Sequence, residues 1–337
     1  MVILSVIFSI DKNRSSLAFI FFLLYPLSLF LATHLDKVKV VKALIIGGLV
    51  VSLFAVIQWG FGFYPHIKFE ILGKIPVSIS GTVVGLQKTN SLVRFLIMVF
   101  PLAIALFGSL KDFFWKFLVV SLLSLGILAM VPTKPLGGMI TFILLLFMAL
   151  FLKDWKIGLA FFVVILIPLL IKPDIPMELI ERFTSYSNVK TRVDTWMRFA
   201  IPTVMKKAPL TGFGVGAYPV ASRIFEGNFR YMHNHPHSFY IYSLSEIGIL
   251  GFLSFFSLIF SSLILSFKMG KKDFLLLGAF FSIVGVLIEG LITSFLEYLP
   301  IGMVFWLILG LVASNFKEKE LRGSLDSHIK KQQKGSL

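Results

Sequence analysis

The sequence predicts an all-α protein that crosses a membrane many times. Of its 337 residues, 57% are hydrophobic and only 15% are charged, and the mean hydropathy is +0.91. A soluble domain has about 25% charged and about 45–50% apolar residues. The apolar residues also lie in long continuous stretches, as lipid-embedded helices require. This composition excludes a cytosolic enzyme and a disordered protein, and the absence of cysteine excludes a disulfide scaffold.

Nine apolar stretches have the length of a bilayer-spanning helix or come close to it, since a span needs about 17–25 mostly apolar residues. We expect these spans near 17–35, 41–61, 91–108, 115–132, 137–152, 157–171, 238–266, 274–292 and 300–315. The apolar segment 1–10 is too short to cross alone and has the length of a partial helix. The sequence therefore predicts about nine or ten transmembrane helices and one larger external loop subdomain.

The spans divide the chain into four parts. These are N-terminal transmembrane helices at 1–171, an external (periplasmic) loop with an amphipathic helix at 172–237, C-terminal transmembrane helices at 238–315, and a basic cytoplasmic tail at 316–337.

The lysines of the short loops give the orientation of the spans. With the expected spans, they all fall on one side of the membrane: Lys37, Lys39, Lys42, Lys111, Lys116, Lys153, Lys156, Lys268, Lys271 and Lys272. Short basic loops stay in the cytoplasm, so this side is the cytoplasmic one. The net charge of +15 therefore indicates topology and contact with membrane lipid, and we expect no nucleic-acid partner.

The external loop contains an amphipathic helix near 189–206. Apolar residues recur there at helical spacing, at Val189, Val193, Trp196, Ala200 and Val204. Arg192 and Trp196 share one face of this helix, and Pro202 should bend it. One interpretation is an interfacial helix anchored by Trp196. The other is that Arg192 is placed to bind an anionic group, because a guanidinium donates two parallel hydrogen bonds to phosphate.

A glycine-rich run follows this helix, with Gly212, Gly214 and Gly216 after Pro209. No strand precedes it, so a phosphate-binding loop is disfavoured. We expect a tight turn that returns the chain to the membrane.

Three histidines crowd the point where the chain re-enters the membrane, at positions 233, 235 and 237. Pro236 suits the first turn of a helix, which would place His237 at the external membrane surface. The histidines are compatible with a metal site, with general acid–base catalysis by one neutral imidazole, or with a polar helix cap.

Glu246 lies about 13 Å deeper along the same helix and points away from His237, so the two are not expected to form a hydrogen-bonded dyad. A carboxyl group at that depth should face other helices as a structural anchor. Gly248 and Gly251 would allow close helix contact there.

The order of these residues resembles the O-antigen ligase/O-antigen polymerase superfamily and is closest to the pattern of O-antigen ligase. The shared features are Arg192-x-x-x-Trp196, Pro209-Leu210-x-Gly212-x-Gly214, and His237-Ser238 followed after nine residues by Gly248-Ile249-Leu250-Gly251. Asn90 in GLQKTNSLVRF resembles the family's Asn segment at the start of an earlier helix. The resemblance covers about residues 80–260. In one departure, Thr133-Lys134-Pro135-Leu136-Gly137 stands where members often have a Ser-Arg-Gly type of segment.

The resemblance implies an enzyme that transfers a glycan from an undecaprenyl-diphosphate carrier to an acceptor hydroxyl on the periplasmic face of the inner membrane. For a ligase the acceptor is lipid A core, the final stage of lipopolysaccharide biosynthesis. The implied catalytic residues are His237, which accepts the hydroxyl proton, and Arg192, which neutralises the departing diphosphate. Candidate substrate-binding residues are Lys134, Arg198, Asn90 and Trp196. No external Asp-x-Asp is present, so we expect a metal-independent site without a cofactor.

The sequence is also compatible with other functions. Within the same class, the acceptor decides between a ligase, an O-antigen polymerase and a protein O-oligosaccharyltransferase. A membrane transporter would show inverted repeats or interrupted helices with charges at the midplane. An inactive membrane scaffold is the remaining alternative.

Overall fold

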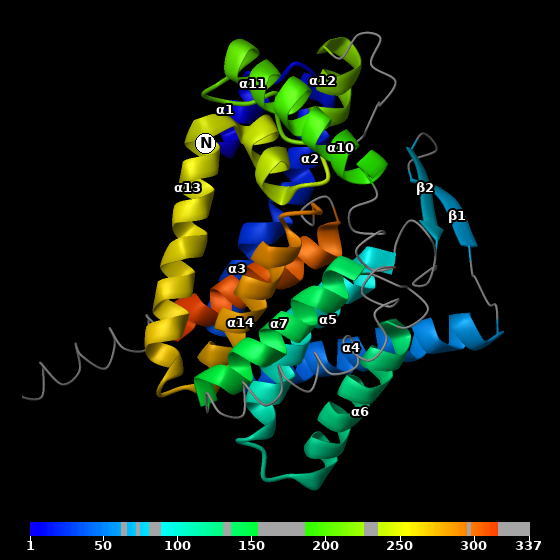
Figure 1. Ribbon diagram of the computed structural model, residues 1–337, viewed down its shortest axis with the longest axis vertical. Helices are drawn as coiled ribbons and strands as arrows, with labels where there is room; N and C mark the ends of the chain where they lie inside the picture. The colour runs from blue at the N-terminus through cyan, green and yellow to red at the C-terminus, as the bar shows by residue number, and fades with distance from the viewer. Residues whose placement is uncertain are drawn as a thin grey trace, which may run out of the picture.

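The computed structural model is a bundle of helices with a smaller helical cap at one end (Figure 1). The described residues are 1–61, 66–71, 75–80, 89–130, 136–153, 186–225, 235–294 and 298–315.

The first half of the chain supplies most of the bundle. Its helices are α1 (Val2–Ile7), α2 (Lys12–Phe22), α3 (Leu24–His34), α4 (Lys37–Phe61), α5 (Thr89–Phe107), α6 (Phe113–Met130) and α7 (Leu136–Lys153). A two-stranded antiparallel hairpin, β1 (His66–Ile71) and β2 (Ile75–Ser80), lies between α4 and α5 in the sequence. This hairpin was not predicted from the sequence.

The second half supplies the cap and completes the bundle. The cap contains α10 (Tyr186–Asp194), the π-helical turn η1 (Thr195–Ala200), α11 (Ile201–Lys207) and α12 (Tyr218–Phe225). The bundle is completed by α13 (Phe239–Gly270), α14 (Phe274–Glu289) and a last helix, Leu299–Asn315.

The predicted class, an all-α polytopic membrane protein, is confirmed. Within the described residues, four helical stretches are long and apolar enough to cross a membrane: Lys12–His34, Lys37–Phe61, Phe113–Met130 and Phe239–Gly270. Three shorter apolar helices accompany them, at Ser91–Phe107, Phe274–Glu289 and Leu299–Asn315. The expected span at 157–171 lies outside the described residues, so the total of nine or ten remains a prediction.

Helix α5 is the centre of the bundle. It is buried on nearly all sides, through residues such as Val93, Ile97 and Phe100. A helix that is apolar around its whole circumference is expected in such a position. Helix α14 packs along α5 at close range, since a Cβ atom on Gly285 would lie 2.6 Å from the Ile97 side chain. The Ser282 hydroxyl donates to the Met98 carbonyl at 2.5 Å, which ties the two helices together.

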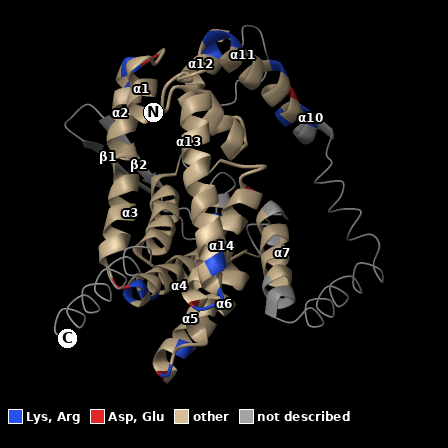
Figure 2. Cartoon of the chain, turned by 90° about the vertical axis from the view of Figure 1, so that its left-hand side faces the viewer, with Lys and Arg blue, Asp and Glu red and all other residues tan. Residues whose placement is uncertain are grey.

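Three of the basic loops predicted to share one side of the membrane, those before α4, α6 and α14, meet at one end of the bundle. Lys37 at the start of α4 donates to Asn315 at the end of the last helix, and Asn315 bonds Asp273 before α14 at 3.4 Å. Lys42 lies 4.2 Å from the centre of the Trp115 ring in α6. Basic side chains also lie on the cap at the opposite end, and the bundle between is almost uncharged (Figure 2).

The predicted amphipathic helix is present as the continuous run α10–η1–α11. Its centre is π-helical: the Ile201 N–H donates to the Trp196 carbonyl, five residues back. Pro202 stands at the start of α11. Proline has no N–H to donate, and its ring would clash with the carbonyl four residues earlier in an α-helix. The predicted bend at Pro202 therefore takes the form of a wider turn just before it.

Helix α13 is broken at Gly248, which the sequence analysis did not predict. Gly248 has φ 65° and ψ −174°, so the helix changes direction there. In an unbroken helix the Ser245 carbonyl would accept from the Ile249 N–H. Instead, Ser245 O accepts from Phe213 N at 2.8 Å, and Ile249 N donates to Pro209 O at 2.8 Å. The predicted glycine turn thus exchanges hydrogen bonds with the break.

This exchange, which we call the glycine interlock, requires small residues on both sides. Gly212 and Gly248 both have positive φ, and a Cβ atom on either would lie within 2.6 Å of the other segment's backbone. Gly214 N donates to Glu246 O at 3.0 Å. The N–H groups of Gly212, Phe213 and Gly214 all donate to backbone carbonyls, so they are not available to bind phosphate. This agrees with the expectation from the sequence that the glycine run is a turn.

We predict that Gly248→Ala destabilises the protein by about 1–3 kcal/mol, because alanine must adopt a left-handed conformation and its methyl group meets the Leu210 carbonyl carbon at 2.4 Å. The measurement is thermal unfolding in detergent. Gly60→Ala in α4 is the control, because nothing lies within 4 Å of its Cβ position. An unfolding temperature for Gly248→Ala equal to that of the wild type would contradict the interlock.

Candidate active site

Three segments meet between the cap and the bundle: the start of α13, the end of α14, and α10–η1. The Phe239 N–H donates to the Gly290 carbonyl at 2.8 Å, and the Tyr240 hydroxyl donates to the Leu287 carbonyl at 2.9 Å. The Trp196 indole N–H donates to the Pro236 carbonyl. The start of α13 is therefore held by α14 on one side and by η1 on the other.

His237 lies in this junction, half-buried, but not within a helix as predicted. Helix α13 begins at Phe239, with Ser238 as its N-cap, and the Phe239 N–H, which has no acceptor within its own helix, donates to the Gly290 carbonyl just beyond α14. Pro236 and His237 therefore precede the first turn, and the expected helical rotation from His237 to Glu246 does not apply. His237 itself has φ 52°. Non-glycine residues in this left-handed region cluster at functional sites.

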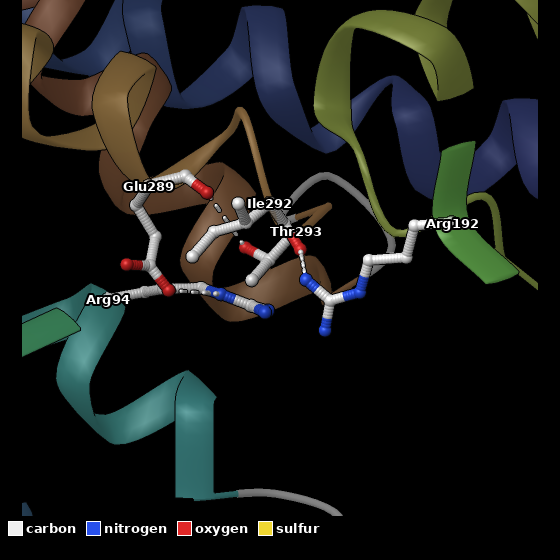
Figure 3. Close-up of polar contacts among 5 residues, drawn as sticks. All are labelled: Arg94, Arg192, Glu289, Ile292 and Thr293. Carbon is white, nitrogen blue, oxygen red and sulfur yellow. Dashed lines mark hydrogen bonds and ion pairs between the residues drawn. The ribbon is translucent and has the colours of Figure 1, made fainter. Parts of the chain in front are cut away.

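Arg192, on α10, reaches into the same junction. Its Nη1 donates to the Ile292 carbonyl at 3.1 Å, just beyond the end of α14 (Figure 3). The carbonyl end of a helix carries partial negative charge and favours a cation. Burial lowers the pKa of the Arg192 guanidinium, and the charge of Glu289 opposes this shift. Among the described residues, Ile292 O is the one hydrogen-bond acceptor of this guanidinium, which has five N–H donors.

A buried ion pair lies beside Arg192. Arg94 Nε on α5 is 3.8 Å from Glu289 Oε1, at the last residue of α14, and the two side chains are only 6% and 4% exposed. The Arg94 guanidinium also lies 5.5 Å from the centre of the Tyr298 ring. In Figure 3, Arg94 and Arg192 approach the end of α14 from different elements. Two guanidiniums and one carboxylate leave the cluster with a net positive charge.

Arg94 was not predicted from the sequence, and Glu289 was given no catalytic role, although a usable signal was present. Both are ionisable residues inside apolar stretches, and such residues usually face the bundle interior and carry a function. Their pairing could not be inferred, because α5 and α14 are far apart in the sequence. Gly138 of α7 also belongs to this neighbourhood, since its Cβ position lies 3.8 Å from Glu289 Oε2.

The other predicted substrate-binding residues are not gathered into this cluster. Lys134 lies outside the described residues, as does His233. Asn90 is in the first turn of α5, but its side chain is not among those described. Arg198 is exposed and pairs with Asp194 at 3.0 Å on the same helix. Of this group, Trp196 is the residue that the structure places against the His237 segment.

Glu246, Gly248 and Gly251 lie away from the junction, further along α13. Glu246 is buried, and its Oε1 accepts from the Tyr218 N–H at 3.5 Å. Gly248 forms the glycine interlock. A Cβ on Gly251 would lie 2.6 Å from the Ile247 side chain, so it would crowd the turn after the break.

We predict that Glu289→Leu destabilises the protein by about 3–5 kcal/mol, because it leaves the Arg94 charge buried without its carboxylate. The double variant Arg94→Met/Glu289→Leu should recover most of this loss, since an apolar pair of similar volume needs no desolvation. Denaturant unfolding in detergent measures all three variants. Losses that simply add in the double variant would show that the pair is not coupled.

Comparison with known proteins finds one family that covers part of this site. A family model described as O-antigen ligase matches residues 123–256, which include Arg192, Trp196, His237 and the glycine interlock. No curated protein matches the chain. The match supports glycan transfer as the general function. It also confirms the predicted resemblance to the O-antigen ligase-like superfamily over this segment of the chain.

Proposed function

We propose that the protein transfers a glycan from an undecaprenyl-diphosphate carrier to an acceptor hydroxyl, most closely as an O-antigen ligase acting on lipid A core at the periplasmic face of the inner membrane. One observation carries this proposal. Within the segment that matches the ligase family, Arg192 and the His237 segment reach the same end of α14, one through Ile292 and the other through Gly290.

In the proposed reaction, His237 is the general base. Its neutral imidazole takes the proton of the acceptor hydroxyl as that oxygen forms a bond to the anomeric carbon of the donor glycan. The bond between the anomeric carbon and the phosphate oxygen breaks, and the electron pair leaves with the diphosphate. The proton on His237 is then released to solvent.

Arg192 stabilises the departing diphosphate. Its guanidinium donates to Ile292 through one nitrogen, which leaves N–H groups in a fork geometry suited to phosphate oxygens. Glu289 and Arg94 are positioning residues in this proposal: their ion pair fixes the end of α14 on α5, and the carbonyls after that end hold Arg192. In this proposal the Arg192 guanidinium supplies the positive charge that a divalent cation supplies in other sugar transferases.

The acceptor distinguishes the members of this class. Proteoliposomes with carrier-linked glycan should be offered lipid A core, a second carrier-linked glycan, or a hydroxyl-bearing peptide. A ligase forms glycosylated lipid A core, a polymerase lengthens the carrier-linked glycan, and a protein O-oligosaccharyltransferase glycosylates the peptide. Movement of the glycan across the bilayer without any new covalent product would instead identify a transporter, and no change at all would favour a scaffold.

We predict that His237→Ala lowers the transfer rate by about 10²–10⁴-fold and Arg192→Ala by about 10²–10³-fold, because each removes one contribution to the transition state. Arg192→Lys should restore only part of the rate, since lysine keeps the charge but loses the fork. The measurement is product formation by purified, folded protein. Arg223→Ala, an exposed change on α12, is the control. Wild-type rates in His237→Ala or Arg192→Ala would refute the assignment.

A further inference from the structure

A large cavity lies between the N-terminal helices and α13. Its volume is about 1010 Å³, and its walls come from α1, α2, α3, α13, the last helix, and the turn before α12. Pockets for small ligands measure roughly 300–1,000 Å³, so this cavity is at the upper end of that range. Arg192 and His237 do not line it. Figure 2 shows α2 and α3 on one side of α13 and α10 on the other.

The cavity is long and apolar along most of its length. On one side it runs from Arg14 to Tyr25, which are eleven residues or about 16 Å apart along a helix. This is about half of a hydrocarbon core of roughly 30 Å, the depth of one lipid leaflet. Apolar side chains line the walls, including Leu17, Phe21, Phe255 and Leu258.

Aromatic side chains line the inner end of the cavity. The rings of Tyr25 and Trp306 are stacked with centroids 6.3 Å apart, and Phe255 stacks on Trp306 at 5.8 Å. Phe22 meets Tyr25 edge to face at 5.3 Å. Because the depth of the cavity matches one leaflet, a lipid acyl chain fits this space better than a peptide segment long enough to cross the whole membrane.

The end near the cap is polar. Arg14 lies there, and its Nε donates to the Gly216 carbonyl at 2.6 Å, which fixes the guanidinium at the mouth. His235, Ser243 and Glu246 line the same end. Ser243 is only 3% exposed, and its hydroxyl has no hydrogen-bond partner among the described residues. A buried hydroxyl of this kind calls for a partner, and a ligand can provide it.

We propose that this cavity binds one membrane phospholipid with a zwitterionic, ammonium-bearing head group, such as phosphatidylethanolamine. Its phosphodiester pairs with Arg14, its ammonium donates to the Ser243 hydroxyl and the Glu246 carboxylate, and an acyl chain follows α2, α3 and α13. The carboxylate disfavours a diphosphate head group, which carries more negative charge and no cationic donor. The lipid would hold α2 and α3 against α13 without entering the active site.

The test is lipid retention by the full-length protein, measured by native mass spectrometry after delipidation and reloading. The probes are phosphatidylglycerol, phosphatidylethanolamine and undecaprenyl phosphate. Wild-type protein should retain phosphatidylethanolamine at least about tenfold better than the other two, the scale of the one charge-assisted hydrogen bond between its ammonium and the Glu246 carboxylate. This readout involves no glycan transfer, so its outcome is independent of the proposed function.

Two matched pairs of variants locate the site. Ser254→Phe places a ring in the cavity and should abolish retention, while Ser257→Phe, at an exposed serine outside the cavity lining, should not. Arg14→Gln should lower the retention of phosphatidylethanolamine about tenfold, because it removes the partner of the phosphodiester, and Lys12→Gln should leave retention at the wild-type level. Equal retention of phosphatidylglycerol and phosphatidylethanolamine by the wild type would overturn the proposal. So would unchanged retention in Arg14→Gln, or a preference for undecaprenyl phosphate.

Discussion

The glycine interlock is the constraint on which the rest of the structure depends. At the break in α13, two hydrogen bonds that a continuous helix would make internally are exchanged with the turn around Gly212. Unpaired backbone groups at membrane depth are costly, so a break is tolerated only where another segment satisfies them. The turn can do this only because Gly212 and Gly248 have no Cβ atom. A Cβ on either residue would lie less than 3 Å from the backbone of the other segment. The interlock thereby fixes the cap on α13, and with it the position of Arg192 relative to His237.

The end of α14 is where the groups of the proposed active site meet. Its terminal carbonyls, which a helix leaves without internal partners, are taken up by the start of α13 and by Arg192. The Arg94–Glu289 pair lies at the same end and adds one cation and one anion in a nearly dry environment. A buried pair of this kind is weak support for stability but holds its groups in one geometry. That geometry suits a site where charge must be neutralised as a diphosphate departs.

Helix α13 separates two environments of different character. On the α10 side is the cationic junction with His237 and Arg192, where we propose the transfer reaction. On the α2 and α3 side is the long apolar cavity with the Arg14 guanidinium at its mouth. Both are connected to the interlock, because Gly216, which holds Arg14, belongs to the same glycine run that bonds α13. The N-terminal helices are therefore tied to the cap as well as to the bundle.

The sequence by itself determined the membrane class, the approximate positions of the helices and the grouping of the basic loops, because hydropathy and charge act locally along the chain. It also identified the amphipathic helix, the glycine turn and the family resemblance, and with them Arg192 and His237 as candidates. Only the tertiary structure revealed that α13 breaks at Gly248, that His237 precedes the helix, and that Arg94 pairs with Glu289. Each of these depends on a partner far away in the sequence: the turn near Gly212 for the break, the Gly290 carbonyl for the start of α13, and α14 for Arg94. Such pairings arise from packing and hydrogen-bond satisfaction between segments, which no local pattern encodes.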